Sequence, residues 1–378
     1  MRFLHLADLH LGKILHKQNL LEDQKYILEQ ILQIADEQKV DAVLIAGDVY
    51  QRNTPSAEAM SIFSNFVAAL AERHLQCFII SGNHDSAERV AYLAPLAQIS
   101  GIYISGAGTA QIYTHKLHDS YGDIVLHLMP FTTPMQVRAA YPEQAEEIQS
   151  YQDAIRIVLE HHPIDTSQRN ILIAHQFLTG AAVCDSEELA IGGLDNVSAA
   201  LFDDFDYTAL GHLHGPQQVT RPEIRYAGSP LKYSFSEVNQ HKSVTIAEIR
   251  EKGSVQIETV PLRPLHEIQV ISGSFSELMN LPHCEDYVQL TVTDAEPPAN
   301  AARALHTVFP NCLQTLFSNA ENGDYVFGNT DIMPEQSDFL SLFAEFYSAQ
   351  HDGAVLSEAQ NQIVSKVLET LDQKAGVQ

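Results

Sequence analysis

The chain of 378 residues has no apolar run close to the ~18 residues that a membrane-spanning helix requires. Its apolar N-terminal segment, residues 3–6, gives way at once to Asp8 and His10, so it is too short for a signal peptide. The four cysteines are far apart and form no C-x-x-C pair, which argues against a disulfide framework or a thiolate zinc site. We therefore expect a cytoplasmic protein with free thiols, no membrane segment and a mature N-terminus at Met1.

Basic residues are also scarce, since 22 Lys and Arg stand against 48 Asp and Glu, for a net charge of −26. Proteins that bind nucleic acids usually carry a basic footprint, because contacts with phosphates supply much of their affinity. This chain has no such footprint in bulk, and the excess acid is disproportionately high in its C-terminal third. By contrast, 18 histidines are many, and they are the first indication of metal chemistry.

Short apolar runs, each followed by turn residues, predict strands at residues 2–7, 41–46, 76–81, 170–175, 206–210, 225–227 and 243–249. Helical patterns lie between the first of them. Asn19 and Glu22 predict a capping box for one helix, and Thr54 followed by Pro55 predicts the start of a second that runs towards Arg73. The alternation of strands and helices predicts an α/β fold with parallel strands.

We expect three parts along the chain: a core over residues 1–263, a small α+β capping domain over 264–320, and a linker with C-terminal helices over 321–378. The turn-rich stretch 250–264 closes the core, and 266–319 has a strand–helix–strand pattern. Residues 322–336 are polar and contain glycine, as linkers do. Two amphipathic helices follow, at 337–350 and at 357–372, the second with a capping box of Ser357 and Gln360.

Polar motifs stand at the ends of five predicted strands. In open α/β sheets, ligands bind outside the carboxyl ends of the strands, so these side chains can converge on one crevice. Glycines in three of the motifs allow sharp turns there. The motifs contain Asp8 and His10, Gly47-Asp48, Gly82-Asn83-His84-Asp85, His175, and Gly211-His212 with His214.

Carboxylate, amide and imidazole ligands together suit Mn²⁺, Fe²⁺ or Zn²⁺, whereas Mg²⁺ prefers oxygen alone. Eight candidate groups are too many for one ion and fit two divalent ions that share a carboxylate. Such a pair can bind a phosphate, generate hydroxide and stabilise a leaving oxygen. Taken singly each motif is weak: Gly-Asp is common in turns, and a lone His175 is more often a core histidine.

Together, these motifs resemble the signature of the calcineurin-like metallophosphoesterases over about the first 260 residues. The resemblance implies a four-layer αββα sandwich with two metal ions and a catalytic His84 that faces the substrate phosphate without binding metal. Asp85 would support an imidazole or, equally, cap a helix before residues 86–96. One ion would take Asp8, His10, Asp48 and His214; the other would take Asp48, Asn83, His175 and His212, with Asp48 bridging.

Three longer stretches are similar to the nucleases of bacterial double-strand-break repair complexes: residues 4–12, the Gly47–Tyr50 motif, and residues 226–237 with Ser234-Phe235-Ser236-Glu237. That resemblance implies exonuclease activity on duplex DNA and endonuclease activity at hairpins and single strands, with Mn²⁺ preferred. It also implies a homodimer bound to a coiled-coil ATPase. One position departs from some relatives, which have a histidine where this chain has Gln51.

Two other functions stay open on the sequence. A phosphodiesterase for small nucleotides would use the same metal site, and a non-catalytic scaffold would keep only the fold. For DNA, the basic residues near the metal motifs are the candidates, although each is as readily a solvated surface charge: Lys13, Lys17, Arg52, Arg89 and Lys232. The acidic tail is expected to bind the ATPase, and the alternative is that its helices fold back on the core.

Overall fold

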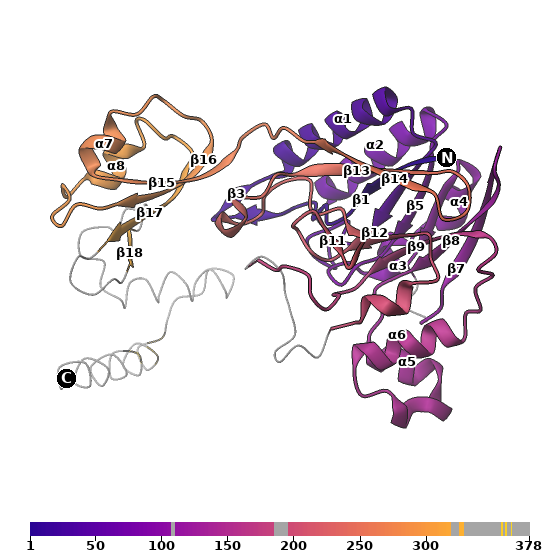
Figure 1. The fold of residues 1–378 in the computed structure, drawn as a ribbon. Helices are drawn as coiled ribbons and strands as arrows, with labels where there is room; N and C mark the ends of the chain where they lie inside the picture. Colours follow the sequence, from indigo (N-terminus) through magenta and orange to yellow (C-terminus); the bar gives the residue numbers. More distant parts are fainter. Residues whose placement is uncertain are drawn as a thin grey trace.

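The computed structural model describes residues 1–106, 110–184, 196–318 and 325–328, together with residues 357, 360 and 364. Two six-stranded sheets pack face to face with helices on their outer sides, and a smaller unit with its own sheet is attached at one end (Figure 1). Among the described helices, none combines the length and the apolar character needed to cross a membrane.

The first sheet has the order β14-β13-β1-β4-β5-β6. Its parallel strands are β1 (Arg2–Leu6), β4 (Ala42–Ala46), β5 (Gln76–Ile80) and β6 (Ile102–Ser105), and β13 (Ser243–Ile249) runs antiparallel to both β1 and β14 (Val255–Pro261). Helices α1 (Leu21–Gln38) and α2 (Ala57–Glu72) cover its outer face. Side chains of β4 alternate, so that Val43 packs with the helices while Leu44 packs between the sheets.

The second sheet has the order β11-β12-β10-β9-β8-β7. These strands are β7 (Tyr113–Asp119), β8 (Gly122–Met129), β9 (Arg169–His175), β10 (Tyr207–Gly211), β11 (Gln217–Val219) and β12 (Arg221–Tyr226). Helices α5 (Pro134–Ala140) and α6 (Tyr151–Glu160) cover its outer face. Phe78, Leu126 and Ile173 belong to the shared core between the two sheets. The expected four-layer αββα sandwich is confirmed.

The attached unit contains β15 (Ile268–Gly273), α7 (Phe275–Met279), β16 (Tyr287–Val292), α8 (Ala301–Leu305), β17 (Cys312–Ser318) and β18 (Tyr325–Gly328). The strand–helix–strand expectation was therefore too simple, because a second helix and two further strands complete one four-stranded sheet. Strand β18 pairs with β17 although it lies inside the stretch predicted as linker. Leu290 and Phe309 are fully buried in a separate core.

Short contacts join this unit to the sandwich through Asp23 at the start of α1. One carboxylate oxygen of Asp23 lies 2.9 Å from His266 Nδ1, and the other accepts a hydrogen bond of 2.9 Å from the Tyr287 hydroxyl. Lys232, expected as a candidate DNA contact, instead pairs with Glu267 at 2.9 Å and has a side chain only 10% exposed. Its charge is thus used within the protein.

Several predicted boundaries were wrong for local reasons. Helix α1 begins at Leu21, and Asn19 accepts a hydrogen bond from its first N–H instead of forming a box with Glu22. The cap of α2 is Ser56, whose Oγ accepts from Ala59 N–H, so Thr54 and Pro55 stand before the helix. Instead of one helix over 86–96 there are two, α3 (Ala87–Val90) and α4 (Ala94–Ile99).

Strand β14 occupies the stretch predicted to be turns, residues 250–264. Further short elements complete the sandwich: the β2 (Ile14–Leu15) and β3 (Gln18–Asn19) hairpin and the 3₁₀ turns Pro142–Glu147, Ala199–Phe202 and Phe235–Glu237.

The helix predicted at 337–350 lies outside the described residues, as does most of the one at 357–372. The capping box of that second helix is confirmed. The Ser357 N–H donates to Gln360 Oε1 at 2.9 Å, the Gln360 N–H donates to Ser357 Oγ at 3.4 Å, and Gln360 and Val364 are helical.

Candidate metal centre

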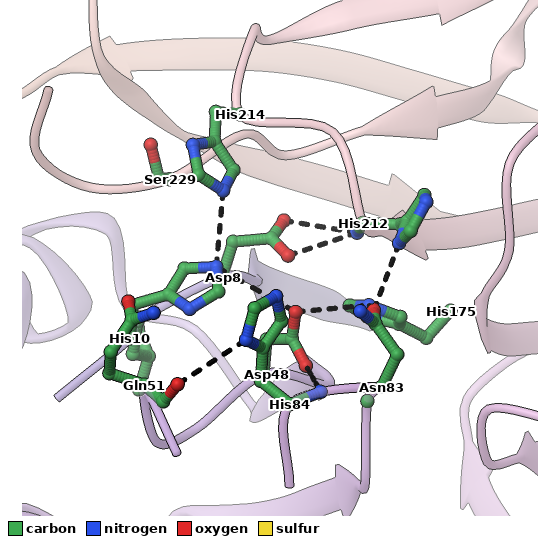
Figure 2. A network of polar contacts seen from close by, with 12 residues as sticks. Asp8, His10, Asp48, Gln51, Asn83, His84, His175, His212, His214 and Ser229 are labelled. Atoms are coloured by element: carbon green, nitrogen blue, oxygen red, sulfur yellow. Dashed lines mark hydrogen bonds and ion pairs between the residues drawn. The ribbon is translucent and has the colours of Figure 1, made fainter. Parts of the chain in front are cut away.

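All eight side chains predicted for the site meet at one edge of the sandwich (Figure 2). The first sheet supplies residues that follow β1, β4 and β5, and the second supplies residues at the ends of β9 and β10. The cluster therefore lies between the carboxyl ends of strands from both sheets, as the topology predicts. The residues are Asp8, His10, Asp48, Asn83 and His84 from the first sheet and His175, His212 and His214 from the second.

Four of these residues have a left-handed backbone, with φ of 53° at Asp8, 45° at His10, 49° at Asp48 and 107° at His212. Positive φ is uncommon outside glycine and clusters at functional sites, where the surroundings hold the strained conformation. Hydrogen bonds help to hold the strained backbone of Asp8 and His212, because the His212 N–H donates to both oxygens of Asp8, at 3.0 and 3.2 Å. The strain aims several side chains into the same small volume.

Two glycines allow the loops after β4 and β5 to touch. Gly47 has φ of 87°, so the expectation of a sharp turn holds there. Gly82 has another role, since a Cβ at this position would lie 2.1 Å from Asp48 Oδ1. A side chain on residue 82 would therefore displace the central carboxylate.

One half of the cluster is built around His175. Its Nδ1 donates to the carbonyl oxygen of Ala46 at 2.8 Å, which turns Nε2 towards Asp48 Oδ2 at 3.3 Å and Asn83 Oδ1 at 2.9 Å. His212 Nδ1 lies 3.0 Å from the same amide oxygen. Burial alone would lower the pKa of His175, but the charge of Asp48 raises it to about 9.

The other half is built around His10. Its Nε2 lies 3.1 Å from Nε2 of His214 and 3.7 Å from Asp48 Oδ2. Two facing ring nitrogens can share at most one hydrogen, and His10 Nδ1 is buried without a hydrogen-bond partner among the described residues. Burial lowers the pKa of His10 well below its ordinary value and that of His212 to about 3, so both imidazoles stay neutral.

This arrangement fits divalent cations. Ligand atoms of Asp8, Asp48 and His175 lie within 4.8 Å of one another, as do those of His10, Asp48 and His84. Burial would raise the pKa of Asp48, yet the neighbouring imidazoles, His175 first, hold it well below its usual range. The ionised carboxylate of Asp48 is thus surrounded by imidazole nitrogens. Carboxylate and imidazole together are a suitable donor set for a borderline metal ion.

These observations agree with the comparison of the whole sequence with known families, in which residues 1–216 match the calcineurin-like phosphoesterases. The chain belongs to that family. It is a metal-dependent phosphoesterase, as the resemblance implied.

The phosphoesterase chain is 32% identical to the SbcD component of the SbcCD nuclease of Staphylococcus epidermidis, over 98% of this chain and 99% of that one. Two solved structures are also similar at 10% identity. A dimetal phosphatase from Danio rerio is covered over 98% of its length and 70% of this chain, with a TM-score of 0.41. The TT1561 protein of Thermus thermophilus is covered over 98% of its length and 68% of this chain, with a TM-score of 0.37.

His84 lies beside the two halves of the phosphoesterase site. Its backbone N–H donates to Asp48 Oδ1 at 2.9 Å, and its ring is edge-on to His10 with centroids 4.9 Å apart. Its Nδ1 lies 3.3 Å from the carbonyl oxygen of Gln51, the residue that departs from some relatives. The ring is close enough to ligate, and its role as a catalytic rather than a metal-binding residue stays a prediction.

Asp85 has neither of its two expected roles. Its carboxylate accepts hydrogen bonds from the backbone N–H groups of Val49, Tyr50 and Gly82, at 3.1, 2.9 and 2.9 Å. The cap of α3 is Ser86. Burial, followed by the charge of Asp48, raises the pKa of Asp85 to about 6. Asp85 thus fixes the two loops that carry Asp48 and Asn83.

The sequence interpretation missed the residues that lie behind the predicted ligands. Gln24 Nε2 donates to the carbonyl oxygen of His10 at 2.8 Å, and Glu237 Oε1 lies 3.1 Å from His214 Nδ1. Glu237 stands in the Ser-Phe-Ser-Glu motif that carried part of the resemblance. An acid that is completely buried is a signal for function, but burial is visible only in the structure.

Proposed function

We propose that the chain is a two-metal DNA nuclease that cleaves phosphodiester bonds. The observation that supports this most strongly is the convergence of carboxylate, amide and imidazole donors from both sheets around Asp48. This donor set suits phosphodiester hydrolysis, and the full-length similarity to a protein named as a nuclease favours DNA as the substrate.

In the proposed centre, one ion would be held by Asp8, His10, Asp48 and His214, and the other by Asp48, Asn83, His175 and His212. Mn²⁺ is the proposed metal, because imidazole and carboxylate ligands are mixed. When bound, the ions supply Lewis acidity towards phosphate oxygen and lower the pKa of water. His84 would face the phosphate or the leaving oxygen as a hydrogen-bond or proton donor, held by its N–H to Asp48.

The proposed reactions are exonuclease cleavage of duplex DNA and endonuclease cleavage at hairpins and single strands. A net charge of −26 implies weak intrinsic affinity for DNA, so a partner is expected to contribute to binding. We propose a coiled-coil ATPase of the SbcC type, bound through the helices at 337–350 and 357–372. The assembly would contain a homodimer of this chain, formed through α1 and α2, and would act in the cytoplasm.

Metal analysis combined with digestion of a labelled DNA hairpin, with and without the ATPase, tests this function. We expect two Mn²⁺ per chain and cleavage that depends on both metal and ATP. Cyclic nucleotides serve as the competing substrate: their hydrolysis without cleavage of any DNA would favour a small-nucleotide phosphodiesterase. A chain that binds no metal would instead be a scaffold.

A further inference from the structure

We propose that Glu237 is a positioning residue for one of the two metal sites, fixing the ring of His214, and that Lys242 holds Glu237 in place. This inference rests on the proposed metal centre. It concerns the segment between Ser229 and Lys242, which follows β12 and contacts both the ring and the backbone of His214. The sequence contains its Ser-Phe-Ser-Glu motif, but no part of the proposed reaction accounts for it.

The contact between Glu237 and His214 determines which ring nitrogen of His214 carries the hydrogen. An ionised carboxylate can only accept hydrogen bonds, so at 3.1 Å the Nδ1 of His214 carries the hydrogen and donates it to Glu237. The lone pair of His214 is then on Nε2, the atom that lies 3.1 Å from Nε2 of His10. A carboxylate behind a histidine orients such a ligand and makes it more basic.

Lys242 makes a buried carboxylate possible at this position. Its ammonium donates to Glu237 Oε2 at 2.6 Å, to Ser229 Oγ at 2.8 Å and to the carbonyl oxygen of His214 itself at 2.8 Å. With this ammonium on Oε2 and the His214 ring on Oε1, both oxygens of the buried acid are paired, as a buried ionised carboxylate requires. One ammonium therefore fixes both the backbone of His214 and the acid that holds its ring.

Tyr233, in the same segment, supports the neighbouring ligand. Its ring stands edge-on to His10 and to His214, with centroids 5.7 and 5.8 Å away. Its hydroxyl donates to the carbonyl oxygen of Leu9 and accepts from Gln24 Nε2 at 3.1 Å. His10 and His214 are proposed ligands of the same ion, whereas His175 is held by Ala46. The segment therefore supports ligands of only one of the two proposed ions.

Because only one of the two ions is supported in this way, the inference can be tested with Mn²⁺ alone. Bound Mn²⁺ is counted from the electron paramagnetic resonance signal of the ion that stays free. Glu237→Gln keeps the shape of the side chain, but its amide must turn an NH₂ group either towards Lys242 or towards His214. We expect one Mn²⁺ to bind about 10–100-fold more weakly and the other to change by less than about threefold. Loss of the spin coupling between the two ions should accompany the change.

Asp206→Asn is the matched control, because Asp206 is also a buried acid beside a lysine, with Lys252 Nζ at 2.8 Å and the Asn170 N–H at 2.7 Å. It should leave both affinities unchanged. Wild-type-like binding of both ions by folded Glu237→Gln would overturn the inference while the metal centre stands. A wild-type protein that binds no Mn²⁺ would instead overturn the proposed centre.

A second measurement needs no folded Glu237 variant. Nitrogen-15 spectra of histidine in the metal-free wild type, assigned by comparison with His214→Gln, report which ring nitrogen carries hydrogen. We expect His214 to carry it on Nδ1. A hydrogen on Nε2 alone would contradict the role of Glu237.

Discussion

His84 is the residue at which ligation and catalysis can be told apart. If its role is to act on the phosphate, His84→Ala should keep both metals and lower turnover by about 10²–10⁴-fold, the usual contribution of a positioned acid–base or electrostatic group. Metal content and hydrolysis of a small phosphodiester would be measured on the same sample. His118→Ala, on an exposed side chain of β7, is the control. Loss of metal from His84→Ala would make it a ligand instead.

The His175–Asp48 pair predicts how metal binding depends on pH. Free histidine titrates near ~6.5, but the charge of Asp48 raises the pKa of His175 to about 9. A ligating imidazole must lose its proton, so Mn²⁺ affinity should rise about tenfold per pH unit up to pH ~9 and then level off. His10 and His212 are already neutral and do not compete.

Calorimetry in buffers of different ionisation enthalpy would count the proton released at pH 7–8. An affinity that is constant between pH 7 and 9 would contradict the strong coupling of His175 to Asp48.

Among single residues, the ligand candidates were predictable because each directly follows a buried strand, and strand ends are visible in the sequence. The residues behind them were not. Glu237 and His214 are 23 residues apart and meet only because the loop after β12 returns to the segment that follows β10. Asp85 was given the wrong role, because its three N–H partners come from two separate loops.

At the scale of elements, the loops after β4 and β5 touch at Gly82 and Asp48. This contact predicts what a methyl group added at residue 82 would do to the metal site. Gly82→Ala would place a Cβ 2.1 Å from Asp48 Oδ1, so the carboxylate must move away from both halves of the site. We expect loss of tight binding of both ions and a fall in the free energy of unfolding of about 1–3 kcal/mol.

Gly273→Ala is the comparison, since its Cβ would have ordinary contacts of 3.4 Å or more with Glu277 and Leu278. It should be nearly neutral in both measurements. Unchanged metal binding in Gly82→Ala would show that the Asp48 loop can move without consequence.

Strands β1, β4 and β5 were predictable because their almost continuous burial leaves uninterrupted apolar runs in the sequence. Strand β14 was missed because it is an edge strand whose residues are all half-buried or exposed, so it has no apolar run. The start of α2 was misplaced because Thr54 and Ser56 are equally good caps, and only the contact with Ala59 N–H decides between them.

The C-terminal helices should be separable from the metal centre. A chain that ends at Gln336 retains every proposed ligand in the sandwich, so it should bind metal and hydrolyse a small phosphodiester. It should fail to bind the proposed ATPase partner or to cleave DNA with ATP. Co-purification with the ATPase, hydrolysis of the small phosphodiester and cleavage of DNA would each be measured for the shortened chain and for the full chain. Full-strength binding to the ATPase by the shortened chain would end this part of the proposal, and an aggregated chain would indicate that the helices pack on the core.

At the scale of the whole molecule, the metal ions would join the two sheets, because each sheet supplies part of the ligand set. Each ion, if it binds to the folded state alone, should raise the free energy of unfolding by about 2.7 kcal/mol at a free metal concentration 100 times its Kd. Asp48→Asn should remove most of this gain, since an amide does not bridge two dications as a carboxylate does. Thermal unfolding with Mn²⁺ and with a chelator would measure it. Two tightly bound ions in Asp48→Asn would contradict the bridge.

The position of β1 in the first sheet has a consequence for synthesis of the chain. This strand pairs with β4, which follows it closely, and with β13, which follows roughly 240 residues later. At about 5–20 residues per second, β1 waits on the order of 10–50 s on the ribosome with one edge unpaired. An unpaired apolar edge is a site for aggregation, so a nascent chain that is released before β13 should depend on chaperones until that strand arrives.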